Sequence, residues 1–194
     1  MEKLIIEEAT VHLPSKGGQG ILVKGNFIIT AAHCVDFSVD TGMMMNDINP
    51  EKIITASGME ILVNILAVEP VSDIAVLGII DAAEFPEDAE KFDIFCKRTR
   101  KIRLFRKDFE LFTEYPAYVY NHLGEWLSGT VIKTVNVANK LVLHPGKELM
   151  PGTSGSPVVN ESGELIGVVS NSSITGSIPF LRNAMPSWLY RLMR

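Results

Sequence analysis

The sequence predicts an all-β protein whose short strands form barrels or a sandwich, followed by a short closing helix. Short apolar runs rich in β-branched residues recur along the chain, and turn residues such as glycine and asparagine separate them. Many short strands at this spacing are typical of closed or stacked antiparallel sheets. A hydrophobic share of 46% against 21% charged residues is ordinary for a folded chain of 194 residues.

The first half of the chain predicts two hairpins and a buried strand. Residues 21–23 and 27–30 form the first hairpin around Lys24-Gly25-Asn26, and 53–56 and 60–68 form the second around Ser57-Gly58. A continuous apolar strand follows at 74–80. After a charged interval, we expect further strands at 117–120, 129–135, 141–144, 157–159, 165–170 and 178–180.

The last residues predict a helix. Pro186 suits the first helical turn, because its missing N–H is not needed there. Trp188, Leu189, Leu192 and Met193 would then form one apolar stripe. We therefore expect a short C-terminal helix after the last strand.

Composition and charge exclude several classes of function. The net charge of −5 and a pI near 5.4 do not favour nucleic acid as a ligand. No stretch is apolar for long enough to cross a bilayer, and the first residues do not resemble a secretory signal. The two cysteines, Cys34 and Cys96, are expected to be unpaired, which favours a reducing, cytoplasmic compartment. We expect neither a cofactor nor a metal site.

Three segments carry residues suited to catalysis. His33 ends Thr30-Ala31-Ala32-His33, Asp73 opens an apolar strand, and Ser154 lies in the glycine-rich loop Pro151-Gly152-Thr153-Ser154-Gly155-Ser156. Each alone has a plain structural explanation: a packed histidine, a turn aspartate and a hairpin loop. Together, in the order His, Asp, Ser, they fit nucleophilic catalysis better than coincidence.

The chemistry explains why these residue types are needed. A serine hydroxyl is a poor nucleophile until a base accepts its proton, and histidine suits that task because its pKa lies near neutrality. An acid fixes the imidazole tautomer and stabilises the imidazolium. Glycines beside the serine let the backbone turn sharply, so that N–H groups point at a developing oxyanion.

The three segments and the strand plan resemble the signature stretches of the chymotrypsin-like (trypsin-fold) serine peptidases, over nearly the whole chain. The resemblance implies two packed six-stranded antiparallel β-barrels with a short C-terminal helix. Residues 1–85 would form the first barrel, 86–110 a charged connector, and 111–194 the second barrel with the helix. The implied reaction is peptide-bond hydrolysis by a serine endopeptidase.

The resemblance also assigns roles to individual residues. His33 becomes the general base, Asp73 its orienting acid and Ser154 the nucleophile. The backbone N–H groups of Gly152 and Ser154 become the oxyanion hole. The Ser-Gly-Ser-Pro form of the loop is closer to the bacterial glutamyl-endopeptidase and HtrA-like branches than to digestive trypsins, so a bacterial or viral source is expected.

The sequence departs from the family in three ways. Thr153 stands where digestive members carry an aspartate that pairs with a new N-terminus, and the Ile-Val-Gly-Gly start is missing, so we expect no activation by N-terminal insertion. Cys34 has no cysteine partner in Gly17 to Gly20, where the disulfide of the histidine loop would form. The segment after Ser154 is too short for the PDZ domain of HtrA proteins, which leaves a bare protease unit.

The resemblance also implies where the specificity pocket lies. Counting back from Ser154 puts Glu148 and Leu149 near the family's pocket floor, with Val169 on the wall. Ser170, Asn171 and Ser172 match the segment that pairs with extended substrate. Two interpretations stay open. Glu148 lies in the pocket and favours a basic P1 residue, or Glu148 is a solvated rim carboxylate and the pocket is apolar. Glutamyl endopeptidases carry a histidine at the position of Val169, so a preference for glutamate is not expected.

The interval between the two predicted barrels is strongly charged. An acid-rich segment at 81–90 precedes a basic stretch at 97–107. Such runs are usually solvated connectors, but this one could also dock an acidic regulatory protein through Arg100, Arg103 and Arg106.

Two other functions were weighed. An α/β-hydrolase does not fit, since Ser156 replaces the last glycine of its motif, a strand follows the serine, and His33 comes first. A catalytically silent binding module with this fold remains the alternative.

Overall fold

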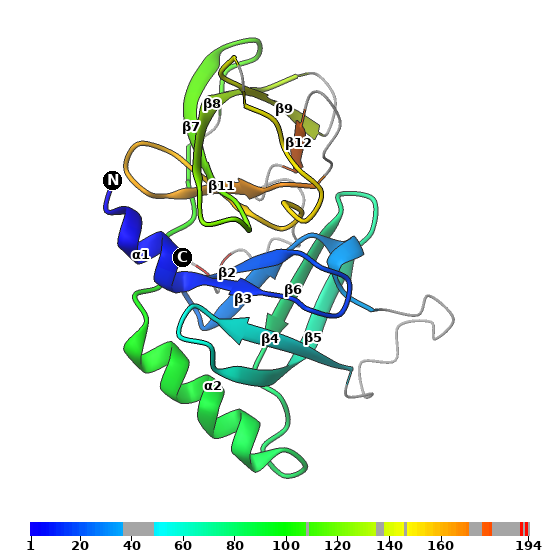
Figure 1. The fold of residues 1–194 in the computed structure, drawn as a ribbon. Helices are drawn as coiled ribbons and strands as arrows, with labels where there is room; N and C mark the ends of the chain where they lie inside the picture. Colours follow the sequence, from blue (N-terminus) through cyan, green and yellow to red (C-terminus); the bar gives the residue numbers. More distant parts are fainter. Residues whose placement is uncertain are drawn as a thin grey trace.

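The computed structural model describes residues 1–36, 49–107, 109–134, 138–145, 147–170 and 176–179, together with 191 and 193. The first half forms a closed barrel in the strand order β1-β2-β3-β6-β5-β4, with antiparallel neighbours (Figure 1). Its strands are β1 (Thr10–His12), β2 (Gln19–Val23), β3 (Phe27–Thr30), β4 (Pro50–Thr55), β5 (Glu60–Glu69) and β6 (Ile74–Gly78). Every residue of β2 and β6 is buried, which explains their unbroken apolar runs.

The second half forms a six-stranded antiparallel sheet in the order β11-β10-β7-β8-β9-β12. Its strands are β7 (Glu114–Tyr120), β8 (Trp126–Ile132), β9 (Ala138–Leu143), β10 (Pro157–Val159), β11 (Leu165–Val168) and β12 (Gly176–Pro179). The sheet curls so that β11 and β12 approach each other (Figure 1). Within the described ranges no hydrogen-bonded ladder joins β11 to β12. Of the two closed barrels expected from the sequence, the structure therefore shows the first, and the second half is a curved sheet.

The hydrophobic core consists of two clusters, and the first also includes Val159, Leu165 and Val168 of the second sheet. The core of the first half includes Ile21, Ile29, Val63 and Leu77, all fully buried, and it extends to α2. The core of the second half includes Val119, Val131 and Val158. Alternating burial along β8 shows why its sequence alternates between apolar and polar residues.

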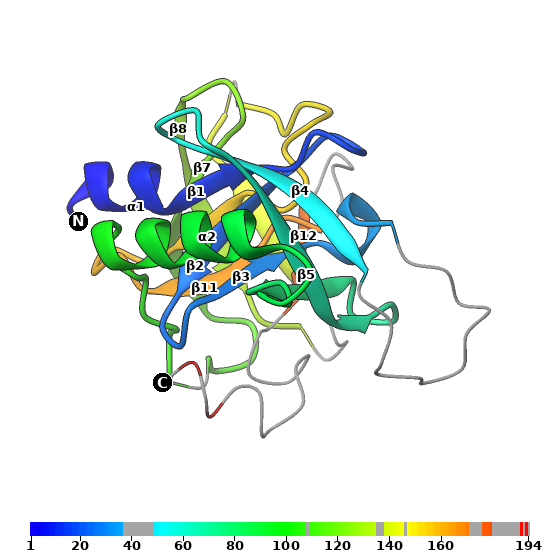
Figure 2. The ribbon, with the colours of Figure 1, turned by 90° about the horizontal axis from the view of Figure 1, so that it is seen from below.

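The charged connector contains a helix that the sequence analysis missed. Helix α2 (Pro86–Arg98) starts at a proline, has acids in its first turn and bases in its last, so the charges follow the helix dipole. Ala89, Phe92 and Cys96, spaced three and four residues apart, are buried, and Phe92 and Cys96 belong to the first core. The helix covers the barrel on the side away from the second sheet (Figures 1 and 2).

A second helix, α1 (Lys3–Ala9), was not predicted either. It buries Ile6 and Ala9 in the core of the first half. Of the predicted C-terminal helix, the described residues include only Arg191 and Met193, and Met193 is fully buried. Pro186, Trp188, Leu189 and Leu192 lie outside the described residues.

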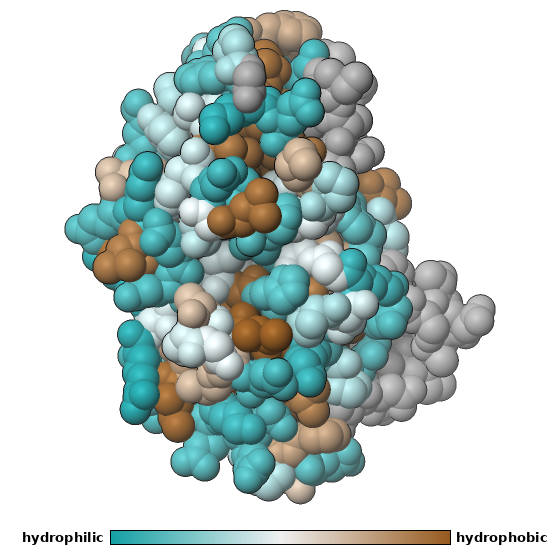
Figure 3. Space-filling view, in the orientation of Figure 1, coloured by the Kyte–Doolittle hydropathy of each residue, from teal (hydrophilic) through white to brown (hydrophobic). Residues whose placement is uncertain are grey.

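The surface is mainly hydrophilic on the face shown in Figure 3, where hydrophobic residues form small separate patches. In the described part of that face no broad apolar patch is present. No helix in the described part of the chain is long and apolar enough to span a membrane.

Candidate active site

His33 lies on a single 3-10 turn, η1 (Ala32–Cys34), directly after β3. The turn is held from two sides. Thr30 Oγ1 donates a hydrogen bond to the Gln19 carbonyl at 2.6 Å, and the Ala32 N–H donates to the Asp73 carbonyl at 3.1 Å. The His33 side chain is 49% exposed, so substrate can reach it.

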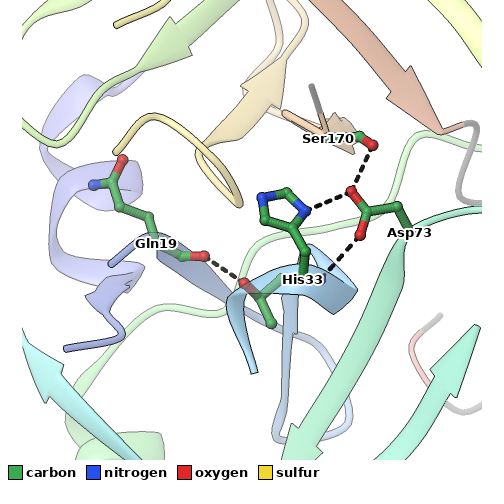
Figure 4. Close-up of polar contacts among 5 residues, drawn as sticks. Gln19, His33, Asp73 and Ser170 are labelled. Atoms are coloured by element: carbon green, nitrogen blue, oxygen red, sulfur yellow. Dashed lines mark hydrogen bonds and ion pairs between the residues drawn. The ribbon is translucent and has the colours of Figure 1, made fainter. Parts of the chain in front are cut away.

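Asp73 faces His33 because it immediately precedes β6, which pairs with β3. Its φ of 53° is in the left-handed region, which aspartate tolerates better than most residues. Oδ1 accepts the His33 backbone N–H at 3.0 Å, and Oδ2 lies 2.8 Å from His33 Nδ1. Oδ2 also accepts the Ser170 hydroxyl at 2.6 Å, so both neighbours point at one carboxylate (Figure 4).

This arrangement fixes the tautomer of the histidine. An ionised carboxylate can only accept, so His33 Nδ1 carries the proton of that bond. In the neutral imidazole, Nε2 then holds the free lone pair. His33 therefore presents a base on the side away from Asp73.

Ser154 lies in the loop between β9 and β10, in a backbone that turns twice through positive φ, at Gly152 (91°) and Gly155 (74°). Thr153 closes the first turn: its N–H and its hydroxyl both donate to the Met150 carbonyl, at 3.1 and 2.6 Å. Thr153 is fully buried and Ser154 is half-buried. Thr153 thus has a structural role in this loop.

The same loop is attached to the first barrel through Gln19. The Gln19 N–H donates to the Ser154 carbonyl at 2.8 Å, and the Ser156 hydroxyl donates to Gln19 Oε1 at 2.5 Å. A side chain on Gly155 would meet the Gln19 carbonyl at 1.9 Å. Strand β2, which carries Gln19, pairs with β3, which leads to His33. The Ser154 loop therefore lies beside the strand pair that leads to His33.

From Gly152 to Gly155, two backbone N–H groups have no acceptor among the described residues. The N–H of Thr153 donates to Met150 and that of Gly155 to the Val169 carbonyl at 2.8 Å. The N–H groups of Gly152 and Ser154 have no acceptor among the described residues. Between His33 and Ser154, both of them described, no hydrogen bond is formed.

The residues predicted for the specificity pocket fall into three groups. Ser170 reaches the site through Asp73. Glu148 is exposed and makes no hydrogen bond or ion pair with the rest of the described chain, while Leu149 packs against the second core and Val169 is fully buried within it. Asn171 and Ser172 lie outside the described residues. The roles of these residues in substrate binding stay predictions.

The cysteines are both free and buried, as expected. Burial raises the pKa of Cys34 to about 11, and the charge of Asp73 adds to the rise. Burial raises the pKa of Cys96 to about 11 as well. A protonated, buried thiol is unreactive, so Cys34 is not a competing nucleophile beside His33.

The basic stretch at 97–107 is largely engaged within the chain. Lys97 pairs with Asp93 at 2.5 Å, Arg100 with Glu2 at 2.8 Å, and Lys101 Nζ donates to the Cys96 carbonyl at 2.6 Å. Ile102 and Leu104 are buried, and Ile102 exchanges backbone hydrogen bonds with the end of β2. The charged side chains of the stretch are mostly exposed, while Ile102 and Leu104 attach its backbone to the first core.

Sequence reasoning missed Gln19. It lies in the Gly17 to Gly20 segment, but nothing in the local sequence shows that it contacts a loop 137 residues away. A search of the described residues finds no group of side chains that could hold a metal ion.

Three similar solved structures are forms of the Rv3671c protease. The inactive form matches at a TM-score of 0.61 and 14% identity, over 91% of this chain and 85% of that chain. A serine-to-alanine mutant from M. tuberculosis H37Rv, also inactive, gives 0.59 and 14% over 91% and 83%. The active form from M. tuberculosis gives 0.61 and 14% over 92% and 78%.

At this identity the likeness shows the fold alone: the chain has the fold of a trypsin-like protease. No protein-family model matches the sequence. No curated protein matches it.

Proposed function

We propose that this chain is a serine endopeptidase that hydrolyses peptide bonds through an acyl-enzyme on Ser154. The observation that carries the proposal is the Asp73 carboxylate, which accepts hydrogen bonds from His33 N, His33 Nδ1 and Ser170 Oγ at 2.6 to 3.0 Å. The attachment of the Ser154 loop to Gln19 supports it, because it brings the nucleophile to the same side of the barrel as the base.

In the proposed reaction the Ser154 hydroxyl attacks the substrate carbonyl carbon while His33 Nε2 takes its proton. The carbonyl oxygen becomes an oxyanion, to which the N–H groups of Gly152 and Ser154 donate. His33 then returns the proton to the leaving amine, and the C–N bond breaks. Water repeats the sequence on the ester and regenerates Ser154.

Asp73 supplies no proton in this scheme. It holds Nδ1–H, which keeps the lone pair of Nε2 toward the serine, and its charge stabilises the imidazolium that forms in both steps. Ser170 and the His33 backbone N–H fix the carboxylate, so the imidazole is oriented before substrate arrives. The missing hydrogen bond between His33 and Ser154 fits this scheme, because such bonds in unliganded enzymes often tighten only with substrate.

The finer predictions of the sequence remain proposals. One is that the chain is closer to the glutamyl-endopeptidase and HtrA-like branches of the trypsin-fold peptidases than to digestive trypsins. The others are a bacterial or viral source, a cytoplasmic location, and division of the chain into residues 1–85, 86–110 and 111–194. Control by an acidic partner protein through Arg100, Arg103 and Arg106 of the basic stretch 97–107 also remains a proposal. Of these, Arg100 pairs with Glu2 and stays exposed.

A fluorophosphonate probe tests the proposal, because it reacts with an activated serine. We expect labelling of the natural protein, none in Ser154→Ala, and full labelling in Ser162→Ala, a matched exposed serine on the β10–β11 turn. Equal labelling in Ser154→Ala would contradict the assignment. If neither labelling nor peptide turnover occurred, the silent binding module would be the better description.

A peptide library tests the pocket. Enrichment of lysine or arginine at P1, lost in Glu148→Gln, would place Glu148 in the pocket. A preference for apolar P1 residues would favour Leu149 and Val169 instead.

A further inference from the structure

The turn between β7 and β8 is built rigidly around one buried side chain. Asn121 Oδ1 accepts the N–H groups of Leu123 and Glu125 at 3.0 and 2.8 Å, and the Asn121 N–H donates to the Glu125 carbonyl at 3.0 Å. Gly124 N–H donates to the Asn121 carbonyl at 3.1 Å. His122, which the turn carries, is therefore held on a fixed backbone although its side chain is exposed.

The imidazole of His122 lies against Gly152. A Cβ added to Gly152 would be 3.3 Å from each of three ring atoms, Cδ2, Cε1 and Nε2. Because the three distances are equal, the face of the ring, and not a single atom, lies over the position that a Cβ of residue 152 would occupy. Since Gly152 also has a φ of 91°, a side chain there would adopt an unfavourable backbone conformation, and the ring would have to shift by a few tenths of an ångström.

The same turn is anchored at its base to α1. Trp126, the first residue of β8, donates its indole N–H to Glu7 Oε1 at 2.7 Å, and Lys3 Nζ lies 5.3 Å from the centre of the Trp126 ring. Tyr120, the last residue of β7, packs on Trp126 with ring centres 5.3 Å apart. Because α1 buries Ile6 and Ala9 in the core of the first half, the turn is tied to both halves of the molecule.

We infer that His122 is a positioning residue for the oxyanion hole: its ring face holds Gly152 in the conformation that directs the Gly152 N–H to the substrate. The inference rests on the proposed function, in which that N–H stabilises the transition state. Glycine has the widest conformational freedom of any residue, and the peptide before it can rotate unless something fills the space beside Cα. His122 fills that space.

The expected effect is on turnover and not on binding. Removing one oxyanion donor costs about 10²- to 10³-fold in kcat. If His122→Ala leaves the loop competent for roughly a tenth of the time, kcat falls about ten-fold. KM for a small fluorogenic peptide, chosen from the library, stays unchanged because His122 does not contact Ser154, His33 or Asp73 by any hydrogen bond in the described chain.

Three variants separate positioning from other roles. His122→Ala removes the ring, His122→Phe keeps a flat ring without charge or hydrogen bonds, and Leu123→Ala changes an exposed neighbour in the same turn. We expect the kcat loss in His122→Ala alone, and recovery in His122→Phe. Full kcat in His122→Ala would overturn the inference, and so would equal losses in the alanine and phenylalanine variants.

The link to α1 is tested with Trp126→Phe, which keeps the ring packing and removes the bond to Glu7. We expect Trp126→Phe alone to lower kcat. If Trp126 and His122 both act on Gly152, adding Trp126→Phe to His122→Ala should lower kcat little further. Fully additive losses would contradict the link.

One readout does not depend on catalysis. In ¹⁵N-labelled protein, the amide resonance of Gly152 should shift or broaden in His122→Ala and stay in place in Leu123→Ala. An unchanged Gly152 resonance would overturn the inference even if the natural protein were inactive. Absence of Ser154-dependent turnover in the natural protein would instead count against the proposed function, so the two failures are distinguishable.

Discussion

The two halves of the molecule hold their parts of the candidate site by different means. His33 and Asp73 stand at the ends of paired strands in a closed barrel. The Asp73 carboxylate holds His33 through both the imidazole and the backbone N–H. Ser154 stands on a loop of the curved second sheet, and its own hydroxyl takes no part in holding it. Backbone bonds to Met150, Val169 and Gln19 hold that loop.

The difference matches what each group must do. In the proposed mechanism Asp73 orients His33 and stabilises the imidazolium without taking its proton, so their relative orientation must be fixed beforehand. In the same mechanism Ser154 and the oxyanion donors must fit a substrate, and a loop with two positive-φ glycines can present several groups at one point. In the first half, kcat should therefore be sensitive to the loss of a polar atom. In the second half, it should be sensitive to a side chain that intrudes on the tightly packed backbone of the loop.

Asp73→Asn should cause the largest loss. The amide keeps the size of the side chain but can stabilise the wrong imidazole tautomer, and in a serine protease such a change lowers kcat by about 10⁴-fold. Steady-state kinetics with a fluorogenic peptide measures this. Asp81→Asn is the matched control, because the Asp81 carboxylate bonds only the backbone N–H of Ala83 in an exposed turn. A loss below ten-fold would show that Asp73 does not orient His33.

Gly155→Ala should come next. The new Cβ would lie 1.9 Å from the Gln19 carbonyl, a backbone atom that cannot retreat, so the loop must move. Displacement of a reacting group by about 1 Å can cost 10²-fold in rate.

Gly58→Ala is the control for Gly155→Ala. Gly58 has a φ of 82° but open space around it, so only backbone strain of about 1 to 2 kcal/mol is expected, seen in thermal unfolding. Normal kcat in Gly155→Ala would mean that Gln19 does not position the loop.

Ser170→Ala should have a smaller effect. It removes one of three hydrogen bonds to the Asp73 carboxylate, and water can replace it because the Asp73 side chain is 22% exposed. A bond to a charged group contributes about 1.5 kcal/mol, which corresponds to roughly ten-fold in kcat at unchanged KM. An increase in KM alone would indicate instead that Ser170 acts on substrate.

The thiols should have the smallest effect, and it concerns stability. Cys34 and Cys96 belong to the first core, and their pKa values rise from 9.0 to about 11. The folded state keeps both protons above pH 9 while the unfolded chain loses them. The stabilisation is therefore complete below pH 9 and is lost as the pH rises toward 11.

Thermal unfolding from pH 8 to 11 tests this. Melting temperatures of a Cys34→Ser, Cys96→Ser variant should fall less steeply above pH 9 than those of the natural protein. Parallel curves would show that neither thiol resists ionisation in the folded state.

The sequence predicted features that depend on near neighbours. Buried strands such as 21–23 and 74–78 have unbroken apolar runs, and the structure has strands there. The catalytic roles assigned to His33, Asp73 and Ser154 stay predictions. Helix α2 was missed because its charges hide the buried stripe of Ala89, Phe92 and Cys96. The contacts of Gln19 with Ser156, and of His122 with Gly152, join residues far apart in the chain, so no local pattern reveals them.

The attachment of the nucleophile loop to Gln19 has a consequence for how the protein is made. A ribosome delivers the chain from its N-terminus, so the strands with His33 and Asp73 leave the exit tunnel before Ser154 does. The loop then takes its place against a strand that already exists. In the proposed mechanism, a nascent chain that has not yet exposed Ser154 cannot form an acyl-enzyme, so hydrolysis begins only after the Ser154 loop has docked on β2.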